Sequence, residues 1–137
     1  MPADHVTARQ LRAATERMDE CRALMASGSR NAVIWCREAA EALAKAVLQA
    51  EVVYYGRERR VGALAGMLPP GHAMAAGLAA LSALDAYGED FGFPDADGRV
   101  REPPSGDVLA AMAARTEAAL ARAAALLGVD PEGGDAA

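Results

Sequence analysis

Residue types that commonly build metal sites and cross-links are scarce in this chain. Its 137 residues include only two cysteines, two histidines and one tryptophan, and aromatic residues make up 4%. Two cysteines cannot form a disulfide framework, and with two distant histidines they are too few for a typical zinc site. The sequence therefore predicts no metal and no cofactor.

Signatures of several enzyme classes are missing as well. No glycine-rich phosphate loop ends in Lys-Ser or Lys-Thr, and neither His-Glu-x-x-His nor Cys-x-x-Cys occurs. The longest apolar run, residues 73–84, is too short to span a bilayer and stops at Asp85. Polar residues such as Asp4 and Arg9 interrupt any early apolar run, so no signal peptide is expected. We expect a soluble, cytoplasmic chain without a membrane segment.

Charge of positive sign is also limited. The net charge of −5 argues against a protein that coats nucleic acid in general, although it leaves room for a local basic patch. The one dense basic cluster is Arg57-Glu58-Arg59-Arg60. It is either a solubilising turn or, together with Lys45, a patch that attracts an anion.

What the chain does have is alanine and helical periodicity. Alanine is the best helix former, while β-branched residues and alternating patterns are few. The pattern predicts an all-α fold, a mostly antiparallel four-helix bundle with one extra short helix. The expected helices cover residues 7–26, 30–55, 61–68, 72–91 and 107–127, with Thr7 as the first N-cap and Ser105 or Asp107 as the last. We expect one domain over residues 7–128, a flexible tail at 1–6 and a disordered acidic tail at 129–137.

The stretch 30–55 has the clearest period. Its apolar row steps by three and four residues, and Glu41, Lys45 and Gln49 recur every four residues on another face. Cys21 and Cys36 are about equally far from the turn at residue 28, so we expect two buried thiols that face each other, with a disulfide as the alternative.

The run at residues 39–48, Ala-Ala-Glu-Ala-Leu-Ala-Lys-Ala-Val-Leu, resembles the Ala-Ala-Glu-Lys-Ala-Leu-Lys-Ala-Leu-Leu run of the HEPN family. These are small α-helical bundles, found in higher eukaryotes and prokaryotes, with proposed nucleotide binding. Three later segments are similar to further HEPN landmarks in the same order: 64–68 to a short Leu-x-x-Leu-Leu helix, 84–87 to Leu-Asp-x-Tyr, and 91–94 to a segment that ends in Arg-Tyr-Pro. The resemblance covers about residues 8–128.

Ribonuclease members of that family carry an arginine, four to six residues, and then a histidine. His72 would need an arginine at positions 65–67, where Ala65, Gly66 and Met67 stand, and His5 has no room upstream. The sequence therefore lacks the expected acid/base group, and we predict no catalytic residues.

The resemblance implies a non-catalytic protein that binds a nucleotide, or a small nucleotidyltransferase partner in a toxin–antitoxin-like pair. It also fits a homodimer, for which the flat helix surface around Gly77 offers room. One alternative is a diverged ribonuclease that acts on RNA, with Asp85 and an arginine of the basic cluster brought together across a dimer. The other is a dimerising scaffold without a ligand.

The residues expected to bind the nucleotide or partner are Glu41, Lys45, Arg57, Arg59, Arg60, Asp85 and Tyr87. Each also has a plainer interpretation. Glu41 and Lys45 can be a solvated helix face, and Tyr87 can be a packing aromatic. Asp85 can simply lie on the outer face of its helix, and the alternative is that it caps or pairs within a cleft.

Overall fold

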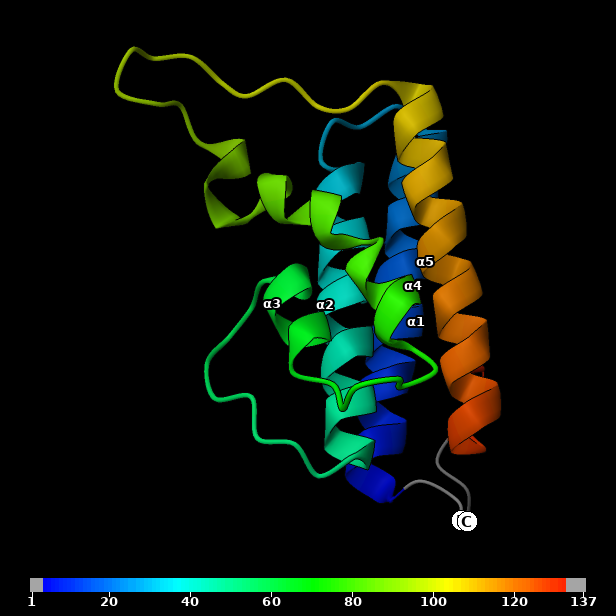
Figure 1. Cartoon of the computed structure of the whole chain (residues 1–137). Coiled ribbons are helices and arrows are strands. Elements are labelled where there is room, and N and C mark those ends of the chain that lie inside the picture. The colour runs from blue at the N-terminus through cyan, green and yellow to red at the C-terminus, as the bar shows by residue number, and fades with distance from the viewer. Residues whose placement is uncertain (1–3, 133–137) are drawn as a thin grey trace.

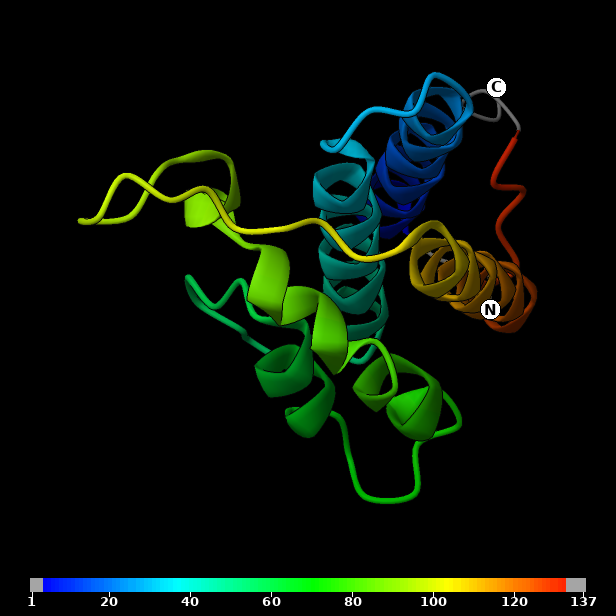
Figure 2. The ribbon, with the colours of Figure 1, turned by 90° about the horizontal axis from the view of Figure 1, so that it is seen from above.

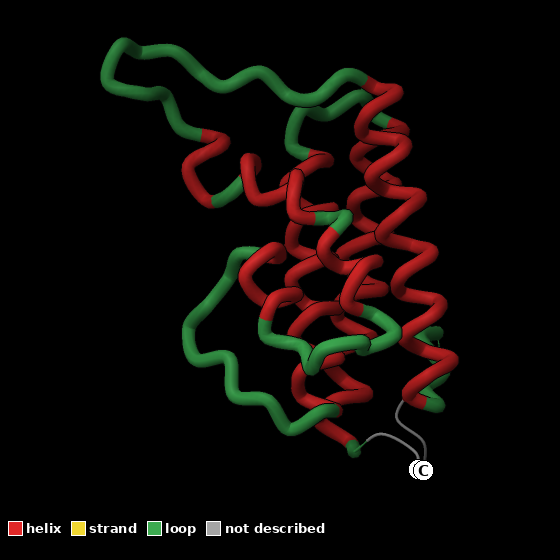
Figure 3. The backbone as a smooth tube through the Cα atoms, in the orientation of Figure 1, coloured by secondary structure: helices red, strands yellow, loops and turns green. Residues whose placement is uncertain are grey.

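The computed structural model describes residues 4–132, and within that range every regular element is a helix (Figure 3). The all-α prediction is therefore confirmed. The elements are α1 (His5–Ala26), α2 (Ala32–Ala50), α3 (Val61–Gly66), α4 (Ala75–Ala79), the 3₁₀ helices η1 (Ser82–Tyr87) and η2 (Glu89–Gly92), and α5 (Gly106–Leu127).

Three long helices, α1, α2 and α5, lie side by side, and α1 runs opposite to the other two (Figure 1). The short elements α3 and η1 pack on α2, and α4 packs on α3 and α5. Seen from above, the segment 93–105 extends away from the helices and returns to the start of α5 (Figure 2). The short elements thus form a second layer over one side of α2.

The core centres on α2, which is buried on most of its surface because neighbours cover it on several sides. Its most extensive packing is against α1, where small side chains such as Ala14, Ala39 and Ala40 are fully buried. Small residues allow two helix backbones to approach closely. The stretch with the strongest period in the sequence is therefore the central element of the fold.

Both cysteines are free and buried between the long helices, as predicted. The Cys36 Sγ atom lies 3.6 Å from the hydroxyl of Thr116 on α5. A hydrogen bond with Cys36, followed by burial, raises the pKa of the Cys21 thiol well above its ordinary value. The two thiols therefore face each other as core groups.

The first and last helices have side-chain caps at their N-termini, and the first cap differs from the sequence prediction. Asp4, not Thr7, caps α1: the Thr7 N–H donates to Asp4 Oδ1 at 2.7 Å. Ser105 caps α5 through the Val108 N–H, and Gly128 ends α5 with φ 67°. Aspartate is a good N-cap residue, and its negative charge is also favoured at a helix N-terminus, which threonine does not provide.

The prediction that the central helix reaches residue 55 was wrong. α2 begins at Ala32 and ends at Ala50, where Val52 turns the chain with φ 56°. The Val53 N–H then donates to the Leu48 carbonyl at 2.9 Å, which closes the helix end. This left-handed position normally holds glycine, and the first glycine is Gly56, so the sequence carried no stop signal at residue 52.

The expected long helix over residues 72–91 was also wrong. The segment is divided into α4, η1 and η2, and the divisions lie close to Leu81 and Gly88. Its large side chains, among them Leu78 and Leu84, still face the core as their spacing predicted. Gly77 and Gly88 weaken helix formation here, and Asp85 is drawn to the backbone of α3.

The predicted tails extend beyond the described part of the chain. Helix α1 already begins at His5, within the expected tail of residues 1–6, while residues 1–3 lie outside the described range. After α5, residues 129–132 lie beside α1 and α5, and residues 133–137 lie outside the described range. The single domain at residues 7–128 remains a prediction.

Candidate functional site

Five charged side chains form a continuous ion-pair cluster along one face of α2. We use this name for Arg37, Glu38, Glu41, Lys45 and Arg59. At its centre, Glu41 Oε1 accepts a hydrogen bond from Arg37 at 2.9 Å, and Glu41 Oε2 accepts one from Lys45 at 2.7 Å. These pairs are one helical turn apart, the spacing at which side chains on a helix meet.

The cluster is largely removed from water. Arg37 is 4% exposed and Glu41 is 6% exposed, although charged residues are seldom buried unless they are paired. A Cβ atom built on Gly88 would lie 3.9 Å from Arg37 Nε, which places the junction of η1 and η2 next to this guanidinium. That distance is an ordinary van der Waals contact, so the chain at position 88 packs directly against the buried arginine.

Arg59 joins the cluster from outside α2. Its Nη2 atom donates to Glu38 at 3.2 Å, and its Nε atom donates to Glu41 at 3.4 Å. The ammonium of Lys45 also lies 5.5 Å from the centre of the Tyr55 ring, a cation–π distance. The segment of residues 51–60, which we call the basic loop, is thereby fastened to the side of α2.

The electrostatic state of Glu41 follows from two opposed effects. Burial alone raises the pKa of a carboxyl group, because it disfavours the charged form. Hydrogen bonds and charge from Lys45, with further hydrogen bonds from Arg59 and Arg37, outweigh burial, so the pKa of Glu41 lies below its ordinary value. Glu41 is therefore a carboxylate at neutral pH.

The outer part of the basic loop carries the remaining cations. Glu58 accepts hydrogen bonds from the Arg60 side chain, at 2.9 and 3.2 Å, and from the backbone N–H groups of Arg60 and Arg59. These bonds lower the pKa of Glu58 to about 2. Arg57 is exposed, and its side chain has no hydrogen bond or ion pair within residues 4–132.

Asp85 fixes the end of the basic loop. Its two carboxylate oxygens accept the backbone N–H groups of Val61, at 2.6 Å, and Gly62, at 2.9 Å. Asp85 thus caps the N-terminus of α3 although it lies 24 residues further along the chain. The N-cap residue itself, Arg60, makes no side-chain hydrogen bond of this kind. A Cβ atom at position 62 would lie 3.1 Å from Ser82 Cβ, so a larger residue there would require Ser82 to shift by a few tenths of an ångström.

The structure thus brings together three of the seven residues predicted from the sequence: Glu41, Lys45 and Arg59 are in direct contact. Arg57 and Arg60 lie on the same loop but point to solvent or to Glu58. Asp85 is a helix cap, one of the two interpretations left open for it. Tyr87 is a packing aromatic, with its ring edge-on to Phe91 at 5.3 Å.

Arg37 and Glu38 belong to the cluster but were not predicted as site residues. Arg37 lies four residues before Glu41, so its pairing was visible in the sequence as an extension of the polar row. Its burial was not visible, because the covering residues come from η1 and η2. Glu38 becomes part of the cluster only through Arg59, 21 residues later.

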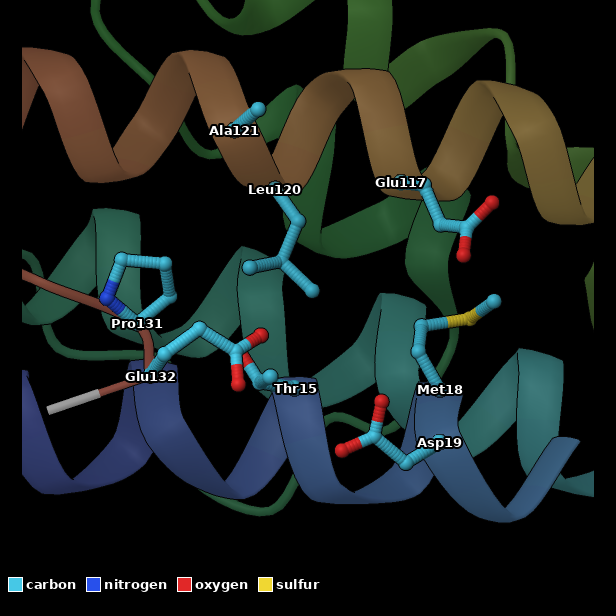
Figure 4. Close-up of a pocket in the computed structure, with 8 residues that line it drawn as sticks. All are labelled: Thr15, Met18, Asp19, Glu117, Leu120, Ala121, Pro131 and Glu132. Atoms are coloured by element: carbon cyan, nitrogen blue, oxygen red, sulfur yellow. The ribbon is translucent and has the colours of Figure 1, made fainter. Parts of the chain in front are cut away.

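A separate hollow of about 220 Å³ lies between α1 and α5, and the segment after α5 closes one side (Figure 4). Its charged side chains are acidic: Asp19 from α1, Glu117 from α5 and Glu132 from the following segment. Met18 and Leu120 supply apolar surface. Such a hollow repels phosphate, so it is not part of the predicted binding surface.

His72 has both ring nitrogens engaged. Nδ1 lies 3.0 Å from the Met74 N–H, which donates to it, and Nε2 therefore carries the proton that it shares with Glu51 at 2.9 Å. This imidazole begins the segment that leads to α4. Both of its ring nitrogens thus have hydrogen-bond partners within the chain.

Among the side chains that the structure describes, those of residues 4–88 and 90–132, no three of His, Cys, Asp or Glu are grouped so that they could hold a metal ion. Over the same residues, no helix combines the length and the apolar character that crossing a membrane requires.

Comparison of the chain with protein-family models, with curated proteins and with solved structures gives no match. The likeness to HEPN domains therefore rests on the residue pattern alone.

Proposed function

We propose that this chain is a non-catalytic, HEPN-like cytoplasmic protein that binds the phosphate groups of a nucleotide at its basic loop. The nucleotide is either free or held by a small nucleotidyltransferase partner, as in a toxin–antitoxin-like pair. In this proposal, α4, η1 and η2 together take the place of the third helix of a four-helix bundle.

The observation that carries the proposal is the construction of the basic loop. Arg59 fastens it to Glu38 and Glu41, and Asp85 fixes its end at Val61, while Arg57 and Arg60 stay at the surface. A loop held in this way presents cations without losing much conformational freedom on binding. Guanidinium groups match phosphate geometry with two parallel hydrogen bonds.

Charge favours the same surface. The ion-pair cluster and the basic loop up to Arg60 contain five cations and four carboxylates. The count of carboxylates includes Glu51 at the start of the loop. Asp85, at the end of the loop, adds a fifth carboxylate, so this surface is close to neutral on a chain whose net charge is −5. Tyr54, exposed beside Gly56, offers an aromatic face on which a base can stack.

The geometry gives less support to the ribonuclease alternative. That reaction needs a group that can take or give a proton beside the RNA backbone. Both oxygens of Asp85 hold α3, and both nitrogens of His72 are engaged. We therefore expect cellular RNA to stay intact during long incubation with the pure protein, and degradation that follows the protein through purification would favour the ribonuclease.

The binding proposal is tested by thermal unfolding and calorimetry with ATP, GTP and inorganic triphosphate. A ligand at one hundred times its Kd adds about 2.7 kcal/mol to the free energy of unfolding, which is a clear shift in Tm. The double variant R57A/R60A should lose this shift. The matched control R115A/R122A, which removes two exposed arginines from α5, should keep it.

The partner arm of the experiment mixes the protein with a purified small nucleotidyltransferase, with and without nucleotide. The proposal fails if no nucleotide or triphosphate shifts Tm and no complex forms. It also fails if R115A/R122A weakens binding as much as R57A/R60A does, because the effect would then reflect general charge.

A further inference from the structure

An apolar patch lies on the surface where α1, α2 and the end of η2 meet. Ile34 and Trp35 contribute from α2 and Phe93 from the residue after η2, and together they line an open hollow of about 590 Å³. Trp35 is 37% exposed and Phe93 is 71% exposed. Aromatic residues concentrated in this way are typical of interfaces between proteins.

The patch carries one charge of each sign. Arg17 on α1 and Glu38 on α2 both line the hollow. Arg17 makes no hydrogen bond or ion pair with any residue in the described range 4–132. Glu38 receives its hydrogen bonds from Arg37 and Arg59 on Oε1, and Oε2 receives none from the same part of the chain.

These two groups are complementary in charge, yet they do not pair with each other within one chain. A strongly acidic or strongly basic partner would find one of them repulsive. In a second copy of the same chain, related by a twofold axis that passes between these two groups, each Arg17 would stand opposite the Glu38 of the other copy. Every such contact then occurs twice, which is the property of an isologous interface.

We propose that this patch is the interface of a symmetric homodimer, with Trp35 and Phe93 of the two copies packed together at its centre. Arg17 of each copy donates to Glu38 Oε2 of the other. This places the interface elsewhere than the surface around Gly77, where an added Cβ atom would meet no other atom within 4 Å. The proposal does not depend on nucleotide binding.

The dimer also completes the ion-pair cluster. Glu38 already accepts from two cations, and a carboxylate has lone pairs for about four hydrogen bonds. Arg17 of the second copy supplies a third cation from the side that is now open to water. The outer edge of the cluster is therefore covered only in the assembled protein.

The test is molar mass by light scattering and sedimentation over a range of protein concentration. The wild-type chain should show twice 14.1 kDa at about 100 μM, since even interfaces of micromolar Kd are largely formed there. F93D and R17E should each show 14.1 kDa. The control L126D, at an exposed apolar position of α5 outside the patch, should remain dimeric.

Exchanging the charges of Arg17 and Glu38 between two variants distinguishes the proposed contact from a nonspecific loss of dimerisation. R17E places two carboxylates opposite each other in its own dimer, and E38R places two cations opposite each other. Mixed in equal amounts, R17E and E38R restore attraction at both contacts, and a mass of twice 14.1 kDa should return.

Circular dichroism establishes that each variant is folded, and F93D and R17E decide the matter if E38R does not fold. A wild-type monomer at about 100 μM would overturn the proposal, since the interface would then be weaker than a micromolar Kd. A dimer that survives F93D and R17E would overturn it too. Both results are independent of any nucleotide titration.

Discussion

Replacing Glu41 by glutamine tests the centre of the ion-pair cluster. The side chain keeps its size but loses its charge. Among the described residues, buried Arg37 then keeps only its ion pair with Glu38. Removing one partner of a buried ion pair typically costs about 3–5 kcal/mol. Losing a single hydrogen bond to a charged group costs about 1.5–3 kcal/mol. Glu38 and the new amide offset part of that loss.

We therefore expect E41Q to lower the free energy of unfolding by about 2–3 kcal/mol at pH 7, measured by urea denaturation. The matched control is E117Q, which breaks the pair between Arg22 and Glu117 with both side chains 43% exposed. Exposed pairs contribute about 0–1 kcal/mol, so this control should change little.

The pH dependence gives a second and independent measurement. The pKa of Glu41 is lower in the folded protein than its ordinary value of 4.5, so ionised Glu41 stabilises the fold above that value. This contribution is lost as the pH falls through the lowered folded pKa. The difference between wild type and E41Q should therefore be largest near neutral pH and shrink in acid.

Two results would refute this reasoning. One is a loss in E41Q no larger than that in E117Q, which would mean that the cluster contributes no more than an exposed pair. The other is a difference between wild type and E41Q that stays constant into acid. Either would show that Glu41 is not held as a carboxylate by Lys45, Arg59 and Arg37.

Two further changes address the end of α2 and the start of α3. V52G should raise the free energy of unfolding by about 0.5–1 kcal/mol in urea denaturation, because glycine accepts the left-handed φ that costs valine about 1–2 kcal/mol. V108G, in the first turn of α5, should lower it, and a loss in V52G would contradict the argument. D85A should cost about 1–2 kcal/mol by removing the cap of α3. Amide hydrogen exchange should speed up at Val61 and Gly62, and unchanged exchange there would show that Asp85 does not hold them.

The sequence was most informative where the structure depends on local signals, such as helical periodicity and capping residues. Steps of three and four residues located the three long helices, and Ser105 and Gly128 marked the ends of α5. The end of α2 could not be found, because Val52 adopts a conformation that its side chain disfavours. The division of residues 72–91 was missed for a related reason: the apolar spacing fits a helix even though the backbone turns near Leu81.

The candidate site shows the same limit. The contact between Glu41 and Lys45 follows from helix geometry, and Arg59 was suggested by the basic cluster. No local sequence pattern indicates that Arg59 folds back onto Glu41. None indicates that Asp85 caps a helix that begins 24 residues earlier. Such contacts depend on how loops return to the bundle, which only the tertiary structure specifies.

The alanine-rich contact between α1 and α2 has a consequence for the order of folding. Alanine has no side-chain rotamers to lose, so joining these two helices costs mainly backbone entropy. They are neighbours in the chain, joined by the short turn at residues 27–31, so their contacts close early. Helix α5 must wait for residues 51–105 to settle. Changes inside the α1–α2 pair should therefore slow folding, whereas changes on α5 should mainly speed unfolding.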